Sequence, residues 1–362
     1  MTAYKDRSKE ELLQEKSQLE AQYKEFQGKG LKLDMSRGKP SAAQLDLSMG
    51  MMDVLDSFTD LKCEAGIDCR NYGVMDGIPE AKRLLGELIE VPADNIIIYG
   101  NSSLNVMFDV VSHAFTHGIM GMTPWHKLDK VKFLCPVPGY DRHFSITEYF
   151  GVEMINVPMT PQGPDMDLVE KLVSEDEAIK GIWCVPKYSN PDGIVYSAET
   201  VRRIAALKPA APDFLLMWDN AYCIHEFDCD YVEFPDIISL CTKYGNADMV
   251  YEFASTSKIT LPGAGISVMA ASTANLAYME KLMDIQMISY DKVNQLRHVL
   301  FLQDKAHTLA LMQQHAAILR PKFRCVLRCL EREIAPLGIA AWQKPTGGYF
   351  VSVNTLPGLA KR

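Results

Sequence analysis

Short hydrophobic runs recur along the chain between residues 95 and 272. Most of them are nearly continuous, with few polar residues between the apolar ones. Such runs are typical of strands that are buried on both faces, as in a parallel sheet covered by helices. Seven segments have this pattern: NIIIYG (95–100), KVKFLCP (130–136), VEMINVPM (152–159), KGIWCVP (180–186), DFLLMWD (213–219), ADMVYEFAS (247–255) and GISVMAAS (265–272).

Amphipathic segments lie between these runs and after them. Residues 103–116 and 198–207 have helical patterns, and residues 270–345 form a long helical region. The segment KPTGGYFVSVNTL (344–356) then predicts one more strand. Strands that alternate with helices predict an α/β fold of the doubly wound kind.

The composition narrows the class of protein. The 362 residues suffice for one large domain with a smaller one attached, or for two ordinary domains. A net charge of −9 argues against nucleic acid or an anionic membrane as partner. The chain shows neither a signal peptide nor a membrane-spanning run, its nine cysteines include no C-x-x-C, and its histidines lack metal-site spacing. We therefore expect a cytoplasmic protein with free thiols and no metal.

Polar and aromatic residues gather where the predicted strands end. In a doubly wound sheet, ligands bind outside the carboxyl ends of the strands. The residues that follow the strands here are Asn101, Ser102, Ser103, Tyr140, Asn190, Asp219, Tyr222, Ser255, Ser257 and Lys258.

Two of these residues suggest chemistry with a carbonyl cofactor. Asp219 closes a buried strand, where a carboxylate is costly unless something charged pairs with it. It either caps the following turn or pairs with a cationic ring nitrogen, such as that of pyridoxal phosphate (PLP), whose protonated ring is an electron sink. Lys258, otherwise an ordinary surface charge, would then form a Schiff base with the PLP aldehyde. The same amine would act as the base that moves the substrate Cα proton.

Three further residues suit the ring of that cofactor. Asn190 lies in SNPDG, which is a turn signal by itself, but its amide is also suited to donate to a phenolate oxygen. Tyr222, three residues beyond Asp219, would donate to the same oxygen. Tyr140 would lay an aromatic face on the ring, although plain packing is the alternative.

A serine-rich helix start suits the phosphate. Asn101, Ser102 and Ser103 stand where an amphipathic helix begins, so they either cap that helix or bind an anion at its N-terminus. Ser255 and Ser257, beside the lysine, would supply further hydroxyl groups.

With these motifs the chain resembles the fold-type I (class I/II) PLP aminotransferases. PKYSNPDG carries the asparagine turn, WDNAY the aspartate and tyrosine, and STSK the lysine. The longer strings LDMSRGKPS, GNSSLN and DKVNQLRH are similar to the bacterial type Ic aspartate aminotransferases. The resemblance implies a large domain with a mainly parallel seven-stranded sheet between helices and a small α+β domain.

The resemblance also assigns roles to residues. It implies that Lys258 forms the internal aldimine, that Asp219 pairs with the ring nitrogen, and that the remaining strand-end residues act as described above. Tyr72, in RNYGVMDG, would reach the phosphate of a neighbouring subunit, which implies a homodimer. Gly38, in RGKP, would lie against the substrate, and Asn190 would contact it too.

The chain departs from the family pattern in two places. Most members have an arginine about eight residues after the lysine, where this chain reads GAGIS. The family arginine for the substrate α-carboxylate lies beyond TGGYFVSV, so we expect a truncated small domain and reduced turnover. Arg297 and Arg37 are candidates for the distal carboxylate of the substrate. A solvated helix arginine is the alternative for Arg297, and Arg37 is equally open.

The sequence therefore predicts a PLP-dependent aminotransferase that moves an amino group between aspartate and 2-oxoglutarate by a ping-pong mechanism. We expect residues 1–45 to form an N-terminal helix and arm, 46–285 the PLP-binding domain, and 286–362 a linker helix with part of the small domain.

Other functions have less support. A β-lyase or a decarboxylase would use the same cofactor, because fold alone does not fix the reaction. An effector-sensing module of a transcription regulator would need a helix-turn-helix domain, and only about 30 residues precede LKLDMSRGKP. A nicotinamide dehydrogenase is excluded because no strand is followed by G-x-G-x-x-G.

Overall fold

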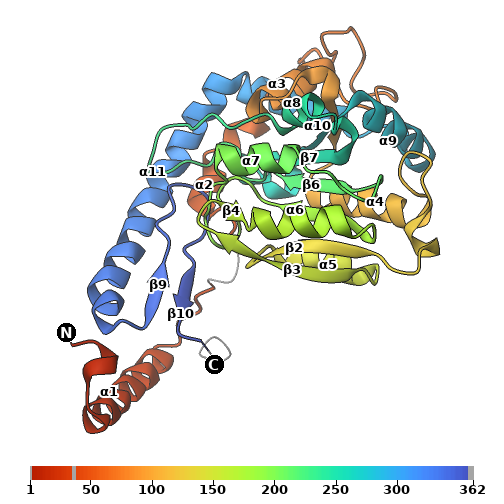
Figure 1. Cartoon of the computed structure of the whole chain (residues 1–362). Coiled ribbons are helices and arrows are strands. Elements are labelled where there is room, and N and C mark those ends of the chain that lie inside the picture. Colours follow the sequence, from red (N-terminus) through yellow and green to blue (C-terminus); the bar gives the residue numbers. More distant parts are fainter. Residues whose placement is uncertain (1, 35–37, 358–362) are drawn as a thin grey trace.

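An eight-stranded sheet forms the centre of the molecule. The computed structural model describes residues 2–34 and 38–357. The strand order is β1-β8-β7-β6-β5-β2-β3-β4 (Figure 1). Strands β3, β2, β5, β6 and β7 are parallel, whereas β8 is antiparallel to both of its neighbours. The strands are β1 (Ile96–Tyr99), β2 (Lys132–Val137), β3 (Glu153–Thr160), β4 (Gly163–Pro164), β5 (Ile179–Cys184), β6 (Leu215–Asp219), β7 (Val250–Ser255) and β8 (Ser267–Ala271).

Each of the seven hydrophobic runs contains one strand, which confirms the predicted mostly parallel sheet. The eighth strand, β4, has only two residues and pairs antiparallel with β3. Burial on both faces was the wrong expectation for β3, in which only Val157 is fully buried. Its place next to the short edge strand β4 leaves much of it facing solvent.

Helices cover both faces of the sheet, because alternate residues of each strand point to opposite sides. In β1, Ile96 and Ile98 join one hydrophobic core, and Ile97 and Tyr99 join the other. The first core contains α3 (Pro79–Ile89), α6 (Met166–Glu175), α7 (Ala198–Ala205), α8 (Ile237–Lys243) and α10 (Lys292–Leu302). The second contains α4 (Ser103–Thr116), α5 (Asp141–Tyr149) and α9 (Thr273–Gln286).

The remaining elements are at the two ends of the chain. Helices α1 (Lys9–Gly28) and α2 (Ala42–Asp46) come first, and no residue of α1 is buried. The long α11 (Lys305–Cys329) leads to β9 (Ala340–Trp342) and β10 (Val353–Thr355), which form a separate two-stranded sheet. Figure 1 shows this small sheet and α1 set apart from the eight-stranded sheet. The expected helical region therefore ends before β9, and the domain boundaries stay a prediction.

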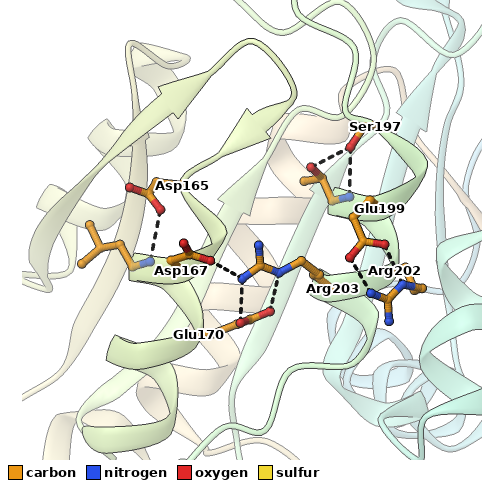
Figure 2. Close-up of polar contacts among 9 residues, drawn as sticks. Asp165, Asp167, Glu170, Ser197, Glu199, Arg202 and Arg203 are labelled. Atoms are coloured by element: carbon orange, nitrogen blue, oxygen red, sulfur yellow. Dashed lines mark hydrogen bonds and ion pairs between the residues drawn. The ribbon is translucent and has the colours of Figure 1, made fainter.

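Helices α6 and α7 are joined on the surface by charged side chains. Arg203 of α7 donates from Nε and Nη2 to Glu170 and from Nη2 to Asp167, both in α6 (Figure 2). The side chains of Asp165 and Ser197 accept backbone N–H groups at the starts of α6 and α7. Such caps satisfy N–H groups that have no partner within the helix.

Two expectations from composition have counterparts in the structure. All nine cysteines are free thiols. Across residues 2–34 and 38–357, none of the helices combines the length and the apolar character that a membrane span requires.

Candidate active site

A cavity of about 780 Å³ opens beside the carboxyl ends of β2, β5, β6 and β7. This is the edge at which open α/β sheets bind ligands, and the volume is typical of a small-molecule site. Gly38 of the N-terminal segment and Phe350 of the C-terminal segment also line it. Five predicted site residues from the strand ends are brought together in its wall: Tyr140, Asn190, Asp219, Tyr222 and Lys258.

Lys258 is the last residue of the 3-10 turn η6 (Thr256–Lys258), which directly follows β7. Its Nζ lies 4.6 Å from the centroid of the Tyr222 ring. Burial lowers the pKa of Lys258, and the opposing effect of the Asp219 carboxylate is smaller. A lysine that releases its proton more readily than a solvated one is suited to act as a nucleophile or a base.

Asp219 ends β6 and is 4% exposed. Its Oδ2 lies 3.0 Å from Nε2 of His143, a fully buried histidine in α5. The His143 ring stacks on Trp183, with centroids 4.5 Å apart and planes 10° from parallel. Asp219 Oδ1 has no hydrogen-bond partner among the described residues. A buried carboxylate oxygen without a partner fits a ligand that brings a positively charged N–H group.

The cavity wall also contains the side chains of Tyr222, Asn190 and Tyr140. Tyr222 is buried, and this burial raises the pKa of its phenol far above the ordinary value, so the hydroxyl keeps its proton. Asn190 lies in the turn after β5 and contributes an amide. The Tyr140 ring is edge-on to His143, with centroids 5.0 Å apart.

The predicted phosphate residues lie together at the N-terminus of α4. Ser257 donates from Oγ to the carbonyl of Asn101, which joins the lysine turn to the start of this helix. Ser102 caps the helix by accepting from the N–H of Asn105, and Ser103 is its first residue. Ser255 accepts the N–H of Ser257. Hydroxyl groups and free helix N–H groups are thus concentrated beside Lys258, as an anion site requires.

An isoleucine, Ile266, occupies the position at which most family members have the phosphate-binding arginine. Ile266, eight residues after Lys258, is buried, and its N–H donates to Thr256 Oγ1. Its side chain therefore offers nothing to a phosphate.

The other predicted residues lie in different settings. A Cβ atom on Gly38 would come within 2.6 Å of the Phe350 ring, so only glycine lets this segment lie so close. Tyr72 is 75% exposed, in the loop before α3. Arg297 donates to Asn294 within α10 and is not among the described residues that line the cavity. Arg37 lies outside the described residues.

Three residues of the site were missed in the sequence. His143 holds Asp219, while Lys39 and Arg142 line the cavity. Neither cation has a hydrogen-bond or ion-pair partner anywhere in residues 2–34 or 38–357. A signal for Arg142 was available, because it lies two residues after Tyr140, in the first turn of a helix that begins at a strand end.

Comparison with known proteins gives the class. The sequence model of the aspartate amino-transferase family matches residues 7–362. An aspartate aminotransferase of Corynebacterium glutamicum is 44% identical over 345 residues, which are 95% of this chain and 79% of that one. A putative aminotransferase of Mycolicibacterium smegmatis is 45% identical over 362 residues, with 99% and 85% covered. The crystal structure of a C. glutamicum aspartate transaminase superposes with a TM-score of 0.96 at 42% identity, covering all of this chain and 85% of the other.

Together, the fold and these relatives define a PLP-dependent aminotransferase. Within that class the chain belongs to the aspartate aminotransferase family, and this membership implies PLP as the cofactor.

Proposed function

We propose that this enzyme transfers the amino group of L-aspartate to 2-oxoglutarate in a ping-pong cycle, with Lys258 as the reacting amine. The observation that carries the proposal is that one cavity holds a half-buried lysine with a lowered pKa and an aspartate oxygen without a hydrogen-bond partner in the part of the chain that the structure describes. Support for the substrate comes from C. glutamicum, where both the matching curated sequence and the matching crystal structure carry the name of an aspartate aminotransferase.

The residues of the cavity fit PLP. Bound PLP would supply an electron sink for the electrons left on the substrate Cα. Asp219 Oδ1 would accept from the ring N–H, while His143 holds the other carboxylate oxygen in place. Tyr222 and Asn190 would donate to the ring oxygen, and Tyr140 would cover the ring face.

The phosphate would lie at the start of α4. The residues suited to hold it are Asn101, Ser102, Ser103, Ser255 and Ser257, which offer hydroxyl, amide and helix N–H groups.

Lys258 would move the proton. Because burial lowers its pKa, a larger fraction of its amine is neutral at a given pH than for a solvated lysine. The neutral Nζ would take the proton from the substrate Cα and deliver it to the cofactor carbon that carried the aldehyde oxygen. Tyr222, whose ring lies under this amine, keeps it close to the reacting carbon.

Two anionic groups on the substrate need positive partners. Lys39 and Arg142 supply two cationic side chains at the cavity. Gly38, which has no side chain, would leave room for a substrate carboxylate, and the Asn190 amide would donate to it. Arg297 and Arg37 remain candidates for the distal carboxylate, with Arg297 acting from a second subunit. Such a contribution and that of Tyr72 require a homodimer, which we propose as the active form.

The test is an absorbance titration of the purified chain with PLP, for wild type and Lys258→Ala. We expect a visible band in wild type only, which borohydride fixes on the peptide containing Lys258 and which L-aspartate bleaches. A band that is unchanged in Lys258→Ala would rule out the lysine. If the unreduced protein with PLP on Lys258 releases a β-elimination or decarboxylation product from aspartate and transfers no amino group to 2-oxoglutarate, transamination is ruled out.

A further inference from the structure

The turn that carries Lys258 is held from behind by side chains that the proposed reaction does not use. Thr256 and Thr260 flank the lysine at equal distance in sequence, and both are fully buried. Thr256 exchanges two hydrogen bonds with Ile266, donating from its backbone N–H and accepting at Oγ1. The N–H of Thr260 donates to the carbonyl of Thr256, 2.8 Å away, which closes the turn around Lys258.

A buried histidine meets both threonines. His298 of α10 is fully buried, and its Nε2 lies 3.1 Å from Thr256 Oγ1 and 3.2 Å from Thr260 Oγ1. Its Nδ1 lies 2.8 Å from the carbonyl oxygen of Asn294. Because a carbonyl only accepts, Nδ1 must carry the proton. In the neutral ring Nε2 is then an acceptor within hydrogen-bond distance of both threonine hydroxyls. The other acceptors near these hydroxyls are the Ile266 carbonyl, 3.4 Å from Thr256 Oγ1, and the Thr256 carbonyl, 3.2 Å from Thr260 Oγ1.

The surroundings of His298 keep the ring in this form. Burial lowers the pKa of His298 to about 4, with a smaller contribution in the same direction from Arg297 and opposing ones from the Asn294 carbonyl and Asp291. Two more buried histidines interact with the backbone of the turn, His225 with Lys258 and His315 with Ile259, and burial lowers the pKa of each. Near neutral pH the turn thus has neutral imidazoles around it.

The same helix also holds the chain beyond the turn. Asn294, one helical turn before His298, donates from Nδ2 to the carbonyl oxygens of Ala264 and Gly265. Helix α10 therefore contacts the lysine turn and the segment that returns from it to β8. A displacement of His298 would be transmitted to both ends of this loop.

We propose that His298 is a positioning residue for Lys258: through Nε2 it fixes Thr256 and Thr260, and so fixes the turn from which the lysine reaches the cavity. This inference rests on the proposed function, because it takes Lys258 as the reacting amine. The histidine touches neither substrate nor cofactor, and it acts only through the two threonines.

The test compares His298→Leu, which removes the acceptor, with His298→Gln, whose side-chain oxygen is able to accept from the threonines. For the Leu variant we expect kcat about tenfold lower, because a small misplacement of a reacting group has a large effect. The pH midpoint of the absorbance band of bound PLP should shift, and backbone hydrogen exchange of residues 256–260 in the PLP-free chain should be about tenfold faster. The Gln variant should recover most of each change.

A second pair of variants does not depend on the fold tolerating a histidine change. Thr260→Val removes one donor with little change in shape, and Thr308→Val is the matched control. Thr308 is equally buried, but its hydroxyl donates to the Asp304 carbonyl at the start of α11. Only Thr260→Val should alter kcat and the pH midpoint.

The outcomes separate the two proposals. A wild-type chain that binds no PLP on Lys258 would overturn the proposed function and this inference with it. A working wild type together with Leu, Gln and Val variants that lose thermal stability alone, at unchanged kcat and pH midpoint, would overturn only the role of His298.

Discussion

At the scale of single residues, Lys258 lowers the stability of the folded chain, because burial disfavours its charged amine. Its buried amine has a lowered pKa, so folding disfavours the proton that the unfolded chain holds up to the ordinary value of 10.5. Between the lowered pKa and 10.5, the unfolded chain binds one proton more than the folded chain at this residue. The free energy of unfolding therefore rises with pH in this window, and the full cost is present below it.

We accordingly predict that Lys258→Met stabilises the PLP-free chain by about 1 kcal/mol at neutral pH. The gain should shrink as the pH rises toward 10.5, because above that value the amine is neutral in both the folded and the unfolded chain. Urea unfolding at a series of pH values measures both effects. A gain that is independent of pH would show that the amine is not the cause.

A second prediction concerns the side chain of the substrate. Arg142 lines the cavity without a partner among the described residues, so Arg142→Gln should raise KM for L-aspartate about tenfold. KM for L-alanine, which lacks the second carboxylate, should change little. Arg202→Gln is the control, because Arg202 is exposed and pairs with Glu199 in α7. Equal effects on both substrates would assign Arg142 to the α-carboxylate or to the fold.

The sequence predicted those site residues that have a recognisable place after a strand. Asp219 ends a hydrophobic run, Lys258 and Asn190 come a few residues after two others, and the structure brings all three to one cavity. His143 was missed because its role depends on contacts across space, namely a carboxylate from β6 and the stacked Trp183. Nothing in the local pattern around a single histidine predicts such a contact.

At the scale of elements, the hydrophobic runs predicted the strands well because most of them are buried on both faces. Strands β5, β6 and β8 are buried at every position. The misses are short strands, β4 and β9, with two and three residues. A pairing that short depends on the neighbouring strand, so periodicity along the chain carries no signal for it.

The cap of α7 provides a prediction about one helix. The side chain of Ser197, which is labelled in Figure 2, accepts the N–H of Thr200, while the Thr200 hydroxyl donates to the Gln162 carbonyl. Ser197→Ala should therefore lower the free energy of unfolding by about 1 kcal/mol, and Ser197→Asp should preserve it. Chemical denaturation gives both values. Equal stability of the alanine and aspartate variants would mean that the Gln162 contact, and not the cap, holds the start of α7.

At the scale of the whole molecule, the question is whether one chain makes a complete site. Tyr72 is 75% exposed and is not among the residues that line the cavity of its own chain. Tyrosine is enriched at protein interfaces, and its exposed position leaves Tyr72 accessible to a second subunit. If Tyr72 acts on a neighbouring subunit, a single chain lacks one of its phosphate contacts, and activity should fall on dilution below the dimer dissociation constant.

Mixing two inactive variants tests this directly. Lys258→Ala lacks the amine but keeps Tyr72, whereas Tyr72→Ala keeps the amine and lacks the tyrosine. When the two chains are co-expressed, each hybrid dimer regains one complete site, in which Tyr72 of one subunit serves Lys258 of the other. Because half of randomly formed dimers are hybrids with one working site of two, activity should return to roughly a quarter of the wild-type value. Tandem affinity tags isolate the hybrid for measurement. A hybrid no more active than the better parent would show that Tyr72 does not act across subunits.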